Sequence, residues 1–88
     1  MAINMNIREI LPEGAIILDN SAFDNSIIGV TLDGRLIYDY DKMIEELIED
    51  DGMCFDEAME WIDYNTIRAL PYAGSGVPII IQRVDWYE

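Results

Sequence analysis

The sequence predicts an α+β domain, in which a three- or four-stranded sheet containing a β-hairpin carries two amphipathic helices packed on one face. Three observations lead to this prediction. Two apolar runs surround an Asp-Gly pair, two segments then repeat apolar residues at helical spacing, and a further apolar run follows near the C-terminus. A length of 88 residues corresponds to one domain, so we expect residues 1–88 to fold as a single unit.

The elements before the hairpin are predicted from short signals. Residues 7–11 predict a helical turn, which Pro12 and Gly14 would close. The apolar run at residues 15–18 then predicts a brief buried strand. We expect this strand to be the first one in the chain and to join the sheet of the hairpin.

The β-hairpin has the clearest local signal. Its two strands are expected at residues 27–32 and 35–39, which are both mainly apolar. The dipeptide Asp33-Gly34 lies between them and favours a type I′ turn. The two strands are therefore expected to pair in an antiparallel sense.

Two helices are predicted after the hairpin. The first begins near Asp41 and ends at Gly52, and the second continues toward Leu70, before Pro71. The apolar face of the first consists of Met43, Ile44, Leu47 and Ile48, and that of the second of Phe55, Ala58, Met59 and Ile62. The link between the helices is short, so we expect them to pack against each other.

The last predicted strand covers residues 77–81. Residues 72–76 before it have the composition of a loop. Pro78 stands near the start of the strand, where a sheet tolerates a residue without an N–H group.

Negative charge is concentrated in the predicted helices. The chain has a net charge of −13, and residues 39–63 contribute −10 of it, because they hold eleven carboxylates and one basic residue, Lys42. These carboxylates are Asp39, Asp41, Glu45, Glu46, Glu49, Asp50, Asp51, Asp56, Glu57, Glu60 and Asp63. A localised anionic field of this kind repels nucleic acid and anionic lipid and attracts a basic groove. We therefore interpret the eleven carboxylates as a candidate partner-binding surface.

The spacing of these carboxylates suggests what the partner binds. Carboxylates four positions apart on a helix are about 6 Å apart along the axis, which is comparable with the spacing of neighbouring phosphates on one nucleic-acid strand. Two such helices would imitate a phosphate track, so a basic nucleic-acid-binding protein is the expected partner and nucleic acid itself is not. The alternative is that the acidic faces are only the solvated sides of two helices. The lack of compensating lysines argues against it, because like charges at i,i+4 destabilise a helix.

Nucleophilic catalysis is not expected. The chain has no histidine, and neither its serines nor Cys54 has an evident activating partner. Cys54 stands where the N-cap of the second helix is expected, which favours a structural position. The Gly74-Ser75-Gly76 segment precedes a strand rather than a helix and so does not predict a phosphate loop. We expect no enzymatic activity and no cofactor.

Asp39 and Asp41 raise the question of a metal site at the junction of strand and helix. A calcium-binding EF-hand loop would need an oxygen ligand and a glycine where the chain has Met43 and Ile44, so that pattern fails. We expect Asp39 or Asp41 to cap the helix instead, and no metal to be bound. The remaining alternative is a small metal-dependent hydrolase or nuclease, whose activity an Asp41→Asn substitution would remove.

The compartment follows from cysteine content and hydropathy. A single cysteine excludes an intramolecular disulfide and favours a reducing compartment. Residues 1–5 lack the basic start and apolar run of a signal peptide, and no apolar stretch approaches the length of a membrane span. We expect a soluble cytoplasmic protein. Trp61 is expected in the core, and Trp86 and Tyr87 are candidate contacts for a homodimer or for another partner.

Two stretches carry a resemblance to known proteins. Residues 23–45 read FDNSIIGVTLDGRLIYDYDKMIE and residues 57–72 read EAMEWIDYNTIRALPY. In these stretches the chain resembles a group of small acidic proteins encoded by bacteriophages and prophages, with similarity over residues 23–81 and its most specific part at residues 61–72. The resemblance brings no catalytic motif. It implies a phage context, in which small acidic proteins often inhibit host defence, as anti-CRISPR proteins do when they occupy the nucleic-acid channel of a nuclease.

The charge and the resemblance together predict a function. We expect a phage-encoded inhibitor of a host defence nuclease, of the anti-CRISPR type, that acts in the host cytoplasm. Its acidic helical face would compete for a nucleic-acid-binding groove whose arginines normally contact DNA. The alternative is a structural or regulatory phage module that self-associates through its aromatic and hairpin surfaces, with an acidic face that serves only solubility.

Overall fold

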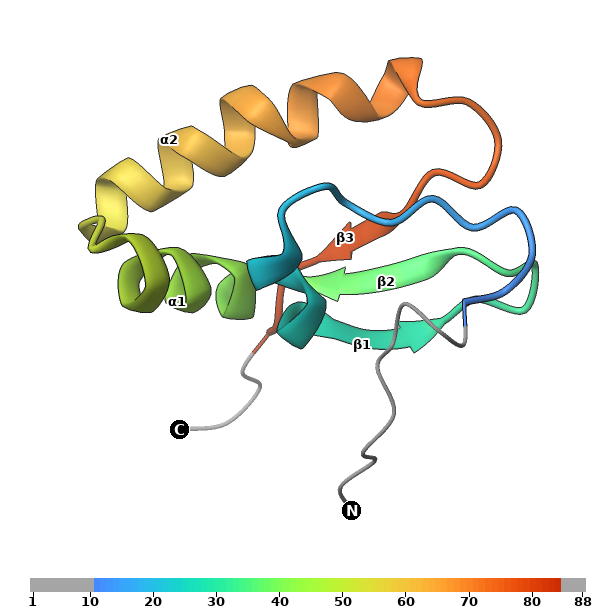
Figure 1. Ribbon diagram of the computed structural model, residues 1–88, viewed down its shortest axis with the longest axis horizontal. Coiled ribbons are helices and arrows are strands. Elements are labelled where there is room, and N and C mark those ends of the chain that lie inside the picture. Colours follow the sequence, from blue (N-terminus) through green and yellow to red (C-terminus); the bar gives the residue numbers. More distant parts are fainter. Residues whose placement is uncertain (1–10, 85–88) are drawn as a thin grey trace.

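The computed structural model describes residues 11–84, which form three strands, two α-helices and two 3₁₀ helices (Figure 1). In chain order these are η2 (Ser21–Ser26), β1 (Ile27–Val30), β2 (Leu36–Asp39), α1 (Tyr40–Asp51), α2 (Phe55–Asn65), η3 (Ile67–Tyr72) and β3 (Ile79–Ile81). Residues 7–10 of the expected helical turn, and the candidate contacts Trp86 and Tyr87, lie outside the described residues.

The sheet has three strands in the order β1-β2-β3. β1 and β2 form the predicted antiparallel hairpin, whereas β3 runs parallel to β2, with Ile37 opposite Ile79. A parallel neighbour requires a long crossover connection, and α1, α2 and η3 supply it, with α2 crossing the molecule on one side of the sheet (Figure 1). The predicted α+β class and the hairpin are confirmed.

Residues 15–18 do not form the predicted strand. They have no strand assignment, and two of their backbone N–H groups donate to acceptors outside the sheet backbone. The Ile16 N–H donates to the carbonyl of Gly76 at 3.1 Å, and the Leu18 N–H donates to the hydroxyl of Tyr38 at 3.0 Å. Because one partner is a loop carbonyl and the other a side chain, these bonds do not extend the sheet.

The hairpin turn also differs from the prediction. A type I′ turn needs positive φ at both central residues, but no residue other than glycine has positive φ in the described chain, and Gly34 has φ 87°. The Gly34 N–H donates to the Thr31 carbonyl at 3.0 Å, which makes Leu32 and Asp33 the central residues of the turn. The Thr31 hydroxyl donates to the Asp33 carboxylate and holds the pKa of that carboxyl below its usual value. This longer turn ends in a left-handed glycine, as in common three-residue hairpin loops.

Helix α1 begins and ends as its capping residues predict. The Asp39 side chain is the N-cap and accepts hydrogen bonds from the backbone N–H groups of Asp41 at 3.0 Å and Lys42 at 3.3 Å. Gly52 follows the last turn with φ 69°, the left-handed conformation that glycine adopts without strain.

Helix α2 is shorter than predicted. It ends at Asn65, and the chain continues as the 3₁₀ helix η3 rather than as α-helix toward Leu70. Pro71 lies within η3. Its lack of an N–H group and the bulk of its ring are incompatible with an α-helix interior, which is consistent with the change to 3₁₀ geometry ahead of it.

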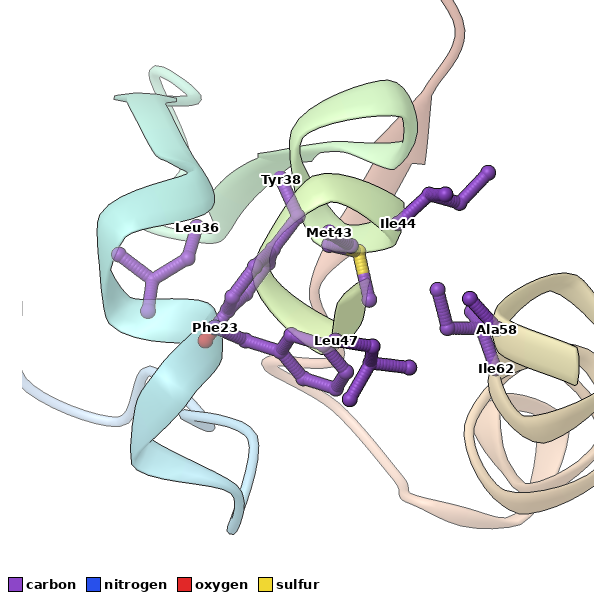
Figure 2. Close-up of a cluster of buried hydrophobic side chains, with 8 residues drawn as sticks. All are labelled: Phe23, Leu36, Tyr38, Met43, Ile44, Leu47, Ala58 and Ile62. Carbon is purple, nitrogen blue, oxygen red and sulfur yellow. The ribbon is translucent and has the colours of Figure 1, made fainter. Parts of the chain in front are cut away.

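The core lies where α1 meets η2, β2 and α2. Figure 2 shows its eight buried side chains, with Leu47 of α1 between the ring of Phe23 and the side chains of α2. They are Phe23, Leu36, Tyr38, Met43, Ile44, Leu47, Ala58 and Ile62. The predicted core face of α1 is confirmed except at Ile48, which is exposed. On α2 only Ala58 and Ile62 are buried, whereas Phe55 is 57% exposed and Met59 is also exposed. Helix α2 thus contributes a narrower apolar stripe than its sequence predicts.

Candidate functional site

Eight of the eleven predicted carboxylates are exposed, and they lie on α1 and α2, which follow each other in the chain. They are Glu45, Glu49, Asp50 and Asp51 on α1, and Asp56, Glu57, Glu60 and Asp63 on α2. The three-residue link at residues 52–54 joins the two helices (Figure 1). We call these eight residues the exposed carboxylates.

Asp39 and Asp41 belong to a different arrangement. Arg83, just after β3, places its Nε 3.1 Å from Asp39 Oδ2 and 3.8 Å from Asp41 Oδ2. The Arg83 backbone N–H also donates to Asp41 Oδ2, at 3.2 Å. Asp39 is only 7% exposed and caps α1 as well. These two carboxylates therefore hold the start of α1 to the C-terminal segment and are less available to a partner.

Glu46 is the third carboxylate that the structure separates from the others. It lies on the buried side of α1 and is 7% exposed. Lys42 Nζ lies 3.7 Å from Glu46 Oε2 and 3.7 Å from Glu45 Oε1, so the one lysine of the chain serves both residues. Burial of a carboxylate beside a lysine indicates a structural role for Glu46.

The basic residues leave most of the exposed carboxylates without an ion pair. Arg35 pairs with Asp33 at 3.5 Å, and the Arg68 guanidinium lies over the ring of Tyr64, with its Cζ 5.3 Å from the ring centroid. Within residues 11–84, no lysine or arginine forms an ion pair with any exposed carboxylate except Glu45. Their mutual repulsion is therefore screened mainly by solvent and salt.

A hollow of about 670 Å³ lies beside the link between the helices. Its lining includes four exposed carboxylates and two aromatic rings, which are those of Asp51, Glu57, Glu60, Asp63, Trp61 and Tyr64. We call it the acidic hollow. Trp61, predicted as a core residue, is half-buried and packs edge-on against Phe23, with the ring centroids 5.8 Å apart.

The aromatic part of this hollow was not predicted from the sequence. Glu57, Glu60, Trp61 and Tyr64 follow the i, i+3, i+4, i+7 spacing that places residues on one helix face. Trp61 also has the helical spacing of the core residues, so the sequence predicts it as a core residue and not as part of the lining of the hollow. Cys54 does occupy the predicted N-cap position of α2, and its N–H donates to Glu57 Oε1 at 3.0 Å.

The ionisation of the Tyr40 phenol is affected by nearby carboxylates. Its pKa is raised above the usual value, chiefly by burial and further by the negative charges of Asp63 and Asp41. The two carboxylates approach Tyr40 from different helices, since Asp41 is on α1 and Asp63 on α2.

An Asp63→Asn substitution is expected to lower the pKa of Tyr40, because it removes one of the charges that disfavour the phenolate. Ultraviolet titration of tyrosinate, with Tyr40→Phe as the reference that identifies the signal, measures the shift. Because the pKa of Tyr40 is raised in the folded state, its phenol contributes fully to the free energy of unfolding below about pH 10. This contribution is lost as the pH rises through the folded-state pKa. The free energy of unfolding of Tyr40→Phe should therefore fall less steeply with pH above about 10 than that of the natural chain. An unchanged Tyr40 titration in Asp63→Asn would contradict the assignment.

Other site chemistry is limited in the described residues. Within residues 11–84, no group of three or more cysteine, aspartate or glutamate side chains is arranged to hold a metal ion. None of the helices in that range is long and apolar enough to cross a membrane.

Comparison of the chain with protein-family models, with curated proteins and with solved structures finds no match.

Proposed function

We propose that this protein binds the basic nucleic-acid-binding groove of another protein and excludes nucleic acid from it. One observation carries the proposal: seven of the eight exposed carboxylates, on two consecutive helices, have no ion-pair partner in residues 11–84. A groove lined by lysine and arginine attracts such a surface at long range and can pair with it at contact.

The distribution of the basic residues supports this proposal. Arg35, Lys42 and Arg83 pair with carboxylates that lie between the hairpin turn and the middle of α1. Among the basic residues that the structure describes, none forms an ion pair with the C-terminal part of α1 or with α2. Carboxylates crowded in this way repel one another and lower stability at low salt. A cationic partner would relieve that repulsion, and part of the binding free energy would come from this relief.

The resemblance to phage and prophage proteins extends the proposal to a biological setting. The protein would then be an inhibitor of a host defence nuclease, of the anti-CRISPR type. A CRISPR nuclease holds its heteroduplex in a positively charged channel and reads a short PAM with arginines, so an acidic surface could occupy either place. Inhibition would be competitive with DNA and would need no catalytic residue.

Displacement of labelled duplex DNA from a purified CRISPR nuclease, loaded with guide RNA, tests this function. The inhibition constant is expected to rise by roughly tenfold to a hundredfold between about 50 and about 200 mM salt, because the contacts are between exposed charges. Failure to displace DNA at low salt from this nuclease and from an unrelated basic DNA-binding protein would defeat the proposal.

A second candidate function rests on the hairpin. Ile28 and Val30 are exposed on alternate positions of the edge strand β1, and Leu32 at the adjoining turn is fully exposed. We propose self-association through this apolar surface as the alternative, with an acidic surface that only keeps the protein in solution. Salt separates the two functions, because an apolar contact hardly weakens over the range in which the charged contact is lost.

A further inference from the structure

We propose that the acidic hollow receives an arginine side chain of the partner. This inference rests on the proposed function and narrows it, because it names one place on the surface and one residue type that binds there. Glu57, Glu60, Trp61 and Tyr64 line the hollow from one face of α2, while Asp51 lines it from the end of α1. At about 670 Å³ the hollow is in the size range of ligand sites, large enough for an arginine side chain with its flanking backbone.

The aromatic rings favour a guanidinium. The Trp61 indole is fixed by its edge-on contact with Phe23, at a centroid distance of 5.8 Å and an interplanar angle of 65°. Tyr64 is 67% exposed, and the guanidinium of the chain's own Arg68 already lies over its ring, with Cζ 5.3 Å from the centroid. Arg68 is not among the residues that line the hollow. The structure thus contains an intramolecular example of the contact that a partner arginine would make.

The carboxylates select the same group by charge and shape. Asp51, Glu57, Glu60 and Asp63 line the hollow, and none of them has an ion-pair partner in the described part of the chain. A guanidinium can donate two parallel hydrogen bonds to one carboxylate while its plane stacks on an aromatic ring. A lysine ammonium is a compact, strongly hydrated charge and does not combine these two contacts in the same way.

Two short peptides test the inference directly. The probes are acetyl-(Gly-Arg)₄-amide and acetyl-(Gly-Lys)₄-amide, which carry equal charge. The protein is used as the Trp86→Phe variant, in which Trp61 is the only tryptophan, so its emission reports the hollow. The arginine peptide is expected to bind about threefold to tenfold more tightly than the lysine peptide and to change the Trp61 emission, as cation–π and bidentate contacts require. Equal affinities with unchanged emission would overturn the inference.

Matched pairs of substitutions locate the binding. Glu60→Gln with Asp63→Asn removes two charges from the hollow, whereas Glu49→Gln with Asp50→Asn removes two exposed charges outside it. The first pair should weaken the arginine peptide at least about threefold more than the second, because it removes contacts as well as field. Tyr64→Leu, at an exposed position, should reduce the preference for arginine over lysine.

The same variants separate this inference from the proposed function. If both pairs weaken the binding of the basic nuclease equally, the hollow has no special role, while competition for the groove still stands. If the arginine peptide binds the hollow but the protein displaces no DNA, the inference holds and the proposed function fails.

Discussion

Reversing four of the exposed carboxylates to lysine is expected to abolish binding to a basic groove, with a loss of affinity of at least about a hundredfold. The four are Glu49, Asp50, Glu60 and Asp63. Each substitution changes the charge by two, so the net charge of the chain moves from −13 to −5 and four attractive contacts become repulsive. Titration of the variant against the loaded nuclease, with DNA displacement as the readout, measures the effect.

The fold should survive this reversal. All four residues are exposed, and none of them lies in the first turn of its helix. Glu49, Asp50 and Asp63 lie near the C-terminal ends of their helices, where the helix dipole favours a positive side chain, and Glu60 lies at the middle of α2. Glu46 is left unchanged because it is buried beside Lys42, and Glu57 because it accepts the Cys54 N–H. Circular dichroism and the melting temperature should therefore match those of the natural chain or improve on them.

A control of equal net charge decides whether position matters. Reversal of Glu9, Glu13, Asp19 and Glu88 to lysine also gives −5, but none of these residues is on α1 or α2. This control is expected to keep most of the binding. If it loses as much affinity as the first variant, only net charge matters and the exposed carboxylates form no specific surface.

Among the glycine-to-alanine substitutions in residues 11–84, Gly76→Ala is expected to cause the largest loss of stability. Gly76 has φ 86°, a conformation that costs an alanine about 1–2 kcal/mol. Its new Cβ would also overlap the carbonyl oxygen of Gly14, a backbone atom that cannot turn aside. The overlap adds about 1–3 kcal/mol and disturbs the hydrogen bond from the Ile16 N–H to the Gly76 carbonyl. The melting temperature should fall by at least about 10 °C.

Gly74→Ala is the matched control for this substitution. Gly74 has φ 92°, but an added Cβ would meet no atom within 4 Å. Its loss of stability should therefore contain only the conformational part, about 1–2 kcal/mol. Thermal or urea unfolding of both variants measures the difference, which isolates the close approach of residues 14 and 76. Equal destabilisation of the two variants would mean that this approach is looser than the structure describes.

The two kinds of variant address different parts of the molecule. The charge reversal concerns helix surfaces that the fold does not need, and the glycine substitution concerns a backbone contact that holds residues 14–16 against the loop before β3. If the first variant loses only binding and the second loses stability, the surface of α1 and α2 can be changed without a change in the stability of the fold. That independence is what a binding function of α1 and α2 requires.

The local elements and the sign of the surface charge follow from neighbouring residues alone. The α1 boundaries follow from Asp39 and Gly52, because a side-chain oxygen at the N-cap and a left-handed glycine at the C-cap act within a single turn. The hairpin strands and the excess of carboxylates follow from neighbouring residues in the same way. Each of these features depends on contacts that are short in sequence.

Long-range contacts, by contrast, fix which carboxylates of residues 11–84 lack an ion pair and which of them line the acidic hollow. Arg83 contacts Asp41 across 42 positions of sequence and also pairs with Asp39, which makes two acids of the predicted surface less available to a partner. Trp61 becomes half-buried because Phe23, from a 3₁₀ helix that the sequence did not reveal, packs against its edge. Residues 15–18 do not form the predicted strand, because the Ile16 N–H donates to the carbonyl of a loop residue and the Leu18 N–H donates to a side-chain hydroxyl. In each case the partner is distant in sequence, and local periodicity carries no information about distant partners.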